Sequence, residues 1–130
     1  MGDTTVAVFA YAVAATLQPK AVEALFPADV ERVRLTKTIA VLRYGPASWA
    51  VAHDFGAIVF LGVEEVERER VMGRLLATLP EEPRPAIQES YTVQVVPGAA
   101  SAVAFGHVVV ADLDARVVEI IALVVAQSAA

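Results

Sequence analysis

Two histidines are the residues of this 130-residue chain best suited to chemistry at neutral pH. His53 is followed by Asp54, and His107 precedes Asp112 by five residues. Two imidazoles and a carboxylate could together bind a metal ion. Nothing in the spacing brings the two histidines together, however. We therefore expect His53 to lie in a turn and His107 at the entrance of a strand, each bonded to backbone or water.

A third polar residue, Glu89, stands between a proline-rich loop and a predicted strand. Such a glutamate is either an exposed residue at the start of the strand or the anchor of a polar site. The second interpretation predicts a pocket between sheet and helices near His53, Glu89 and His107. It would make the chain a regulatory domain that binds a small molecule, which we carry as the alternative function.

Other motifs of enzyme chemistry are missing from the sequence. It has no cysteine, and hence no thiolate nucleophile and no cysteine-based zinc site. It has no GxxxxGK[ST] phosphate loop, and Gly56 and Gly62 are better explained as a tight turn and a strand terminus. No serine sits in a nucleophile elbow. We therefore predict no catalytic residue, no cofactor and no bound metal.

The composition predicts one domain with a substantial core. The hydrophobic fraction is 57% and the mean hydropathy +0.59, with much of the excess in Ala and Val. The longest apolar stretches, residues 6–17 and 117–126, are shorter than the roughly 20 residues that span a bilayer. The start of the chain lacks the basic residues of a secretory signal. A net charge of −5 opposes broad nucleic-acid binding. We expect a cytoplasmic domain that does not itself insert into a membrane.

Hydrophobic periodicity and turn residues divide the chain into strands and helices. The predicted strands are residues 4–17, 32–44, 49–62, 91–96 and 107–111, and the predicted helices are 19–26, 64–79 and 114–130. Residues 49–62 fit either two short strands with a turn near 54–56 or one bent strand. The order, roughly β-α-β-β-α-β-β-α, predicts a single α+β domain over 1–130. In it, helices pack on one face of a mostly antiparallel mixed sheet.

The charge-rich helix at 64–79 has two interpretations. Its charges could form an acidic patch for a partner, or they could be a solvated face on which Glu64 pairs with Arg68 four residues later. We favour the solvated face. An apolar stripe is predicted to bury the other side of this helix, and it consists of Met72, Leu75, Leu76 and Leu79.

The final helix, 114–130, is apolar nearly all round, and after its start only Arg116 and Glu119 are charged. Asp112 or Asp114 can cap its beginning. Its end lacks a glycine and a basic last turn, so we expect it to continue into a helical region beyond this sequence. Such a helix needs cover from another copy of the chain or from partner helices. The residues predicted to make that contact are Val117, Ile120, Ile121, Val124, Gln127 and Ser128.

Three segments resemble one known family. "FGAIVFLG" (55–62) with the Glu-rich helix after it, "IQESYTVQV" (87–95), and the ending "VVVADLDARVVEIIALVVAQSAA" resemble segments of the family named for "required for meiotic nuclear division". Leu61 departs from the pattern, because an aromatic residue is common there. The resemblance implies the globular part of a longer, often membrane-anchored protein that serves as an oligomeric scaffold, and it implies no catalytic residue. Our leading hypothesis is accordingly a non-catalytic interaction or assembly module.

Overall fold

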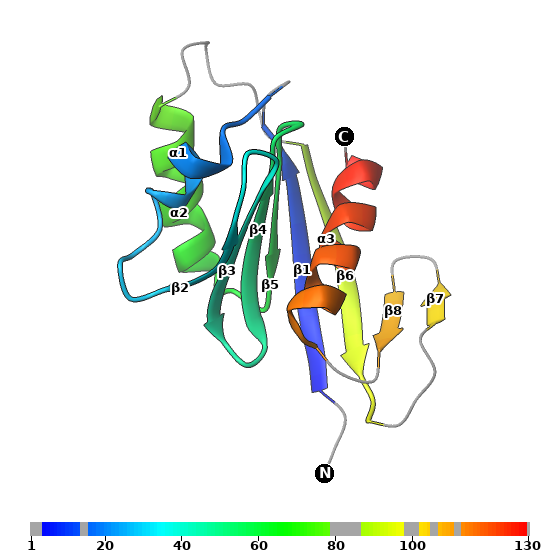
Figure 1. The fold of residues 1–130 in the computed structure, drawn as a ribbon. Coiled ribbons are helices and arrows are strands. Elements are labelled where there is room, and N and C mark those ends of the chain that lie inside the picture. The colour runs from blue at the N-terminus through cyan, green and yellow to red at the C-terminus, as the bar shows by residue number, and fades with distance from the viewer. Residues whose placement is uncertain are drawn as a thin grey trace.

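The computed structural model describes residues 4–13, 16–78, 87–97, 102–104, 107–110 and 113–129 (Figure 1). Within these ranges the elements along the chain are β1 (Thr4–Ala12), α1 (Pro19–Glu23), β2 (Glu31–Leu35), β3 (Ile39–Gly45), β4 (Ser48–His53), β5 (Ala57–Leu61), α2 (Glu65–Thr78), β6 (Ile87–Val95), β7 (Ala102–Ala104), β8 (His107–Val110) and α3 (Ala115–Ala129). The predicted α+β class is confirmed. The prolines at 80, 83 and 85, which were assigned to a loop, lie outside the described residues.

All the strands join one mixed sheet in the order β2-β3-β4-β5-β1-β6-β8-β7. Neighbouring strands are antiparallel except for β6 and β8, which run parallel. The mostly antiparallel mixed sheet is therefore confirmed. The strand predicted at 32–44 is in fact two strands, because Thr36 breaks it. The Thr36 hydroxyl accepts hydrogen bonds from the backbone N–H groups of Thr38 and Ile39, at 3.2 and 3.1 Å, a local turn that competes with a straight strand.

Residues 49–62 form two strands, the first of the two alternatives that the sequence left open. Gly56 lies in the turn between β4 and β5 with a φ of 97°, a backbone conformation that favours glycine. Gly62 follows the end of β5 with a φ of 63°, as expected of a strand terminus. The short strand β7 was not predicted, since its three residues give too brief a pattern to separate from a loop.

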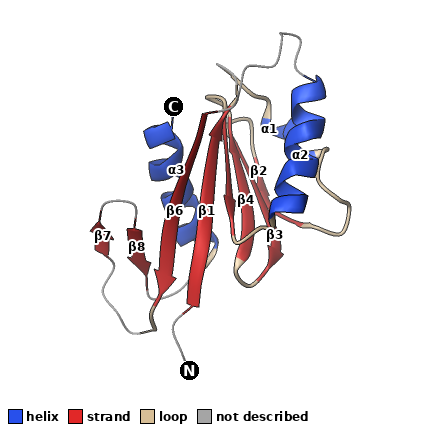
Figure 2. Cartoon of the chain, turned by 180° about the vertical axis from the view of Figure 1, so that it is seen from behind, coloured by secondary structure: helices blue, strands red, loops and turns tan. Residues whose placement is uncertain are grey.

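The helices cover both faces of the sheet, and the prediction that they pack on one face is wrong (Figures 1 and 2). Val41, Val51 and Val59 pack in one core with α3. Their neighbours Leu42, Ile58 and Phe60 point to the opposite face and pack in a second core with α1 and α2. The reason is that the central strands are apolar on both sides. All of β5, for example, is buried, so each face needs its own cover.

The helix α2 is held on its face of the sheet by apolar and polar contacts. Val71, Met72 and Leu75 are buried against the sheet. Leu76 is only half-buried, and Leu79 lies outside the described residues. The Tyr44 hydroxyl donates a 2.7 Å hydrogen bond to Glu67, whose carboxylate also pairs with Arg70. Burial alone would raise the pKa of Glu67, but the hydrogen bonds from Arg70 and Tyr44 outweigh it and lower this pKa.

Arg68 does not form the predicted surface ion pair with Glu64. Its side chain is buried under α2, where the guanidinium lies 3.7 Å from the centre of the Phe9 ring. It donates hydrogen bonds to the Val63 carbonyl oxygen at 2.6 Å and to the Tyr11 hydroxyl at 3.3 Å. A guanidinium can be buried in this way because its flat face stacks on an aromatic ring while its edge donates hydrogen bonds. The charged face predicted for this helix is therefore only partly solvated.

Candidate functional site

The helix α3 packs on the sheet through one apolar stripe. This stripe is almost completely buried and consists of Val118, Ile121, Ala122, Val125 and Ala126. The helix is capped by Asp114, whose Oδ1 accepts a 2.9 Å hydrogen bond from the N–H of Val117. Asp112, the other predicted cap, lies outside the described residues. No helix in the described part of the chain is long and apolar enough to cross a bilayer.

An ion pair ties the outer side of α3 to the edge of the sheet. Arg34 of β2 reaches Glu119 of α3 at 2.7 Å, across 85 positions of sequence. The Arg34 side chain is 55% exposed, so solvent screens the pair and its contribution to stability is small. The contact nevertheless links the edge strand β2 to the helix. It closes one end of the space between them.

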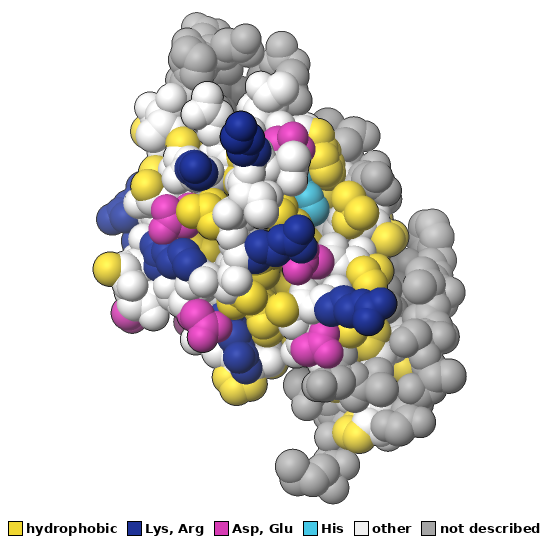
Figure 3. Space-filling model, in the orientation of Figure 1, with side chains coloured by type: hydrophobic (Ala, Val, Ile, Leu, Met, Phe, Trp, Pro, Cys, Tyr) yellow, Lys and Arg dark blue, Asp and Glu magenta, His cyan; other side chains and the backbone are white. Residues whose placement is uncertain are grey.

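A row of large hydrophobic side chains remains exposed on α3. Ile120 is 55% exposed, Leu123 42% and Val124 52%. Their spacing places them on one face of the helix, and we call these three residues the α3 ridge. Figure 3 shows hydrophobic side chains gathered over this helix. Single exposed hydrophobic residues are normal, but neighbouring ones form the kind of patch that marks a binding surface.

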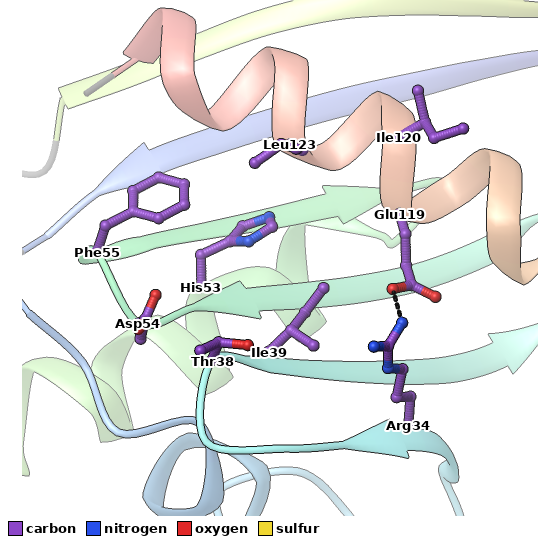
Figure 4. A pocket seen from close by; sticks show the side chains of 9 residues that line it. All are labelled: Arg34, Thr38, Ile39, His53, Asp54, Phe55, Glu119, Ile120 and Leu123. Carbon is purple, nitrogen blue, oxygen red and sulfur yellow. Dashed lines mark hydrogen bonds and ion pairs between the residues drawn. The ribbon is translucent and has the colours of Figure 1, made fainter.

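Between α3 and strands β2 to β4 lies an open groove of about 360 Å³ (Figure 4). Its lining combines apolar side chains from sheet and helix with a polar rim, and consists of Arg34, Thr38, Ile39, His53, Asp54, Phe55, Glu119, Ile120 and Leu123. Two residues of the α3 ridge thus form one wall of the groove. A concave site with apolar walls and a few polar groups is the usual form of a small-ligand site.

His53 is the polar group at the floor of the groove. It is the last residue of β4, paired with Ile39 of β3 and Ala57 of β5, and it is only 4% exposed. Its ring stacks on Phe55, with centroids 4.9 Å apart and an angle of 25° between the rings. Its Nε2 atom has no hydrogen-bond partner among the described residues. The sequence placed His53 in a turn, whereas the turn begins one residue later, at Asp54.

The buried position of His53 makes it sensitive to pH. Burial lowers its pKa from the ordinary 6.5, and the nearby Asp54 carboxylate offsets only part of this effect. Since the unfolded chain then takes up a proton more readily than the folded protein, His53 makes no pH-dependent contribution above about pH 6.5. As the pH falls below that value, the free energy of unfolding decreases by up to about 1.4 kcal/mol per pH unit.

Urea unfolding at pH 7.5, 6.5 and 5.5 tests this expectation in the native chain and in His53→Gln. Every other titrating group, His107 included, is common to both proteins. The native chain should therefore lose more stability between pH 6.5 and 5.5 than the variant does. The same pH dependence in both proteins would show that His53 titrates normally.

The structure does not bring together the three residues predicted to share a polar pocket. Glu89 lies in β6 opposite Ala10, and His107 begins β8 opposite Thr92. Three strand spacings separate β4 from β6 and four separate β4 from β8, or about 14 and 19 Å. The side chains of Glu89 and His107 lie outside the described part of the structure. Of the predicted polar site, His53 alone lines the groove.

The residues predicted to meet a partner take different positions on α3. Ile120 and Val124 are exposed. Ile121 is 5% exposed, and Val117 packs partly against the same core, so both mainly contact the protein's own sheet. The side chains of Gln127 and Ser128 lie outside the described residues. Leu123 was not predicted, although its spacing from Ile120 is a signal that could have identified it.

Other residues of the groove gave no signal in the sequence. Arg34 and Phe55 reach α3 only through the strand order, which no local pattern specifies. Among the described residues, no group of three or more histidine, aspartate or glutamate side chains is arranged to hold a metal ion. The chain finds no match among protein-family models, curated proteins or solved structures. The function is therefore argued from the geometry of this site.

Proposed function

We propose that this domain is a non-catalytic assembly module and that a second copy of the chain binds to the α3 ridge. The observation that carries the proposal is the exposure of Ile120, Leu123 and Val124 side by side on a helix whose other face is buried. Burying apolar area of this kind is the main driving force of protein association. The family resemblance, which implies an oligomeric scaffold, supports the same function.

The chemistry of the α3 ridge favours a second copy as the occupant, because an apolar ridge can bury itself against the same ridge of another copy. Two copies related by a two-fold axis near Leu123 would pair their α3 helices antiparallel, with the same surface used on both sides. The ridge itself carries no charged residue, so this contact brings no like charges of the ridge together.

Sedimentation equilibrium over a range of protein concentrations tests the proposal with two matched variants. Val124→Lys places a charge in the α3 ridge beside the two-fold axis, where the lysines of the two copies would lie near each other, so it should raise the dimer dissociation constant at least about tenfold, or 1.4 kcal/mol. Val66→Lys makes the same change at a residue of α2 that is 76% exposed, and it should leave the constant unchanged. Both variants should keep the native stability of the monomer within about 0.5 kcal/mol.

Two results would count against assembly through this surface. One is a native chain that stays monomeric at millimolar concentration. The other is a dimer that Val66→Lys and Val124→Lys weaken equally, since only Val124 belongs to the α3 ridge.

A further inference from the structure

The groove beneath α3 contains a buried polar atom that the protein leaves unpartnered. His53 is 4% exposed, and its Nε2 has no hydrogen-bond partner in the described ranges. Leaving a buried polar atom unpaired costs about 1–3 kcal/mol, and most such atoms in folded proteins are paired. Figure 4 shows the His53 ring turned toward the helix side of the sheet, into the groove. Because Nε2 is closed off from solvent, a ligand in the groove could supply the missing hydrogen bond only when the His53 ring or a side chain over it turns aside.

The surroundings of His53 restrict the charge of such a ligand. Arg34, the cation of the lining, is already paired with Glu119 at 2.7 Å. Asp54, at the rim beside His53, has a carboxylate that repels anions. The imidazole itself is neutral at pH 7, because its pKa is lowered by burial. No free positive charge in the described lining is therefore available to balance an anionic ligand.

The shape of the groove favours a flat apolar body. The His53 and Phe55 rings are stacked with 25° between their planes, so the groove already contains a pair of packed flat rings. Ile120 and Leu123 stand on the helix side of the groove. Aromatic rings pack well against such surfaces, by offset stacking and by edge contacts. The volume of about 360 Å³ is in the range of small-ligand sites.

We propose that this groove is a binding site for a small, uncharged aromatic molecule that carries one hydroxyl or N–H group. The ring of the ligand lies between Phe55 and the helix side chains, and its O–H or N–H donates a hydrogen bond to Nε2 of His53. A phenol or an indole has this chemistry. The site shares Ile120 and Leu123 with the α3 ridge, but His53 and Phe55 do not belong to the ridge and Val124 does not line the groove.

The proposal is tested by NMR titration of the 130-residue chain with three probes of similar size: p-cresol, toluene and benzoate. We expect p-cresol to bind with a Kd of about 1 mM, and to shift the amide signals of residues around the groove, such as Thr38, Phe55 and Leu123. Toluene lacks the hydroxyl and should bind about tenfold more weakly, the loss expected for one hydrogen bond. Benzoate should bind more weakly than p-cresol, because no cation is free to pair with it.

A variant separates the hydrogen bond from the shape of the site. His53→Phe keeps a ring on Phe55 but removes the acceptor, so it should bind p-cresol and toluene with equal affinity. Val124→Lys, which tests assembly, should bind p-cresol as the native chain does. The comparison of probes on the native chain remains decisive even if His53→Phe fails to fold.

Several results would overturn the proposal. The first is the absence of a saturable shift at p-cresol concentrations up to about ten times the expected Kd. The second is equal binding of p-cresol and toluene by the native chain. The third is a set of shifted signals that lies away from the groove. If the chain does not assemble but still binds p-cresol, the assembly proposal fails and the binding-site proposal holds. If the chain assembles but does not bind p-cresol, only the binding-site proposal fails.

Discussion

Replacing Val118 by aspartate is expected to lower the free energy of unfolding by about 3–5 kcal/mol. Val118 is fully buried where α3 meets the sheet, in the core formed with strands β1, β4 and β5. The substitution removes apolar contacts and introduces a carboxylate that is too short to reach water. Since a domain of this kind is stable by only about 5–15 kcal/mol, we expect much of the native packing of α3 to be lost.

Val124→Asp is the matched control for this prediction. It makes the same change six residues later on the same helix, at a side chain that is 52% exposed. Its effect on the monomer should stay within about 0.5 kcal/mol, apart from a small loss of helix propensity. Urea unfolding at a concentration where the chain is monomeric measures both variants. Equal destabilisation would mean that α3 is not oriented on the sheet as described.

The contrast between these two valines also shows where the sequence is informative about α3. The uniform apolar surface from Val117 to Ala126 correctly predicted a helix, but it could not show which side is buried. An amphipathic helix reveals its buried face through its polar residues, and the only charged residues of α3 are Arg116 and Glu119. Ile121 was therefore assigned to a partner contact, although it packs on the protein's own sheet.

The strands show a similar limit. The apolar run of β5 is typical of a strand buried on both faces, and every residue of β5 is buried. The same feature requires cover on two sides, yet the expected order of elements suggested helices on one face only. The turns between β2 and β3 and between β4 and β5 are encoded locally, by Thr36 and Gly56. The order of strands in the sheet depends on contacts between distant segments, which no local pattern specifies.

The candidate site was the hardest part to predict, because it depends on such distant contacts. His53 was identified from its residue type alone. Its burial follows from its position at the end of β4 beneath α3, and its stacking on Phe55 follows from the turn that begins at Asp54. Glu89 and His107 shared only the residue types suited to a polar site, and the register places them several strands away.

Replacing Gly62 by alanine is expected to be the second most damaging change, at a cost of about 2–4 kcal/mol. Gly62 has a φ of 63°, a conformation that is unfavourable for residues with a Cβ atom. A Cβ atom at this position would also overlap the carbonyl oxygen of Ala47, which is backbone and cannot rotate away. The backbone there is held on both sides. The Gly62 N–H donates to the Ala7 carbonyl at 2.8 Å, and the Ser48 hydroxyl donates to the Gly62 carbonyl at 2.9 Å.

Gly73→Ala is the control for Gly62→Ala, with an expected effect of opposite sign. Gly73 lies within α2, and an added Cβ atom would meet nothing within 4 Å. Alanine should therefore raise the free energy of unfolding by about 1 kcal/mol through its better helix propensity. Urea unfolding with an unchanged m-value measures both effects. A Gly62→Ala protein as stable as the native chain would contradict the left-handed turn that ends β5. With that turn in place, the chain leaves β5 toward the face of the sheet that α2 covers, opposite the face on which α3 packs.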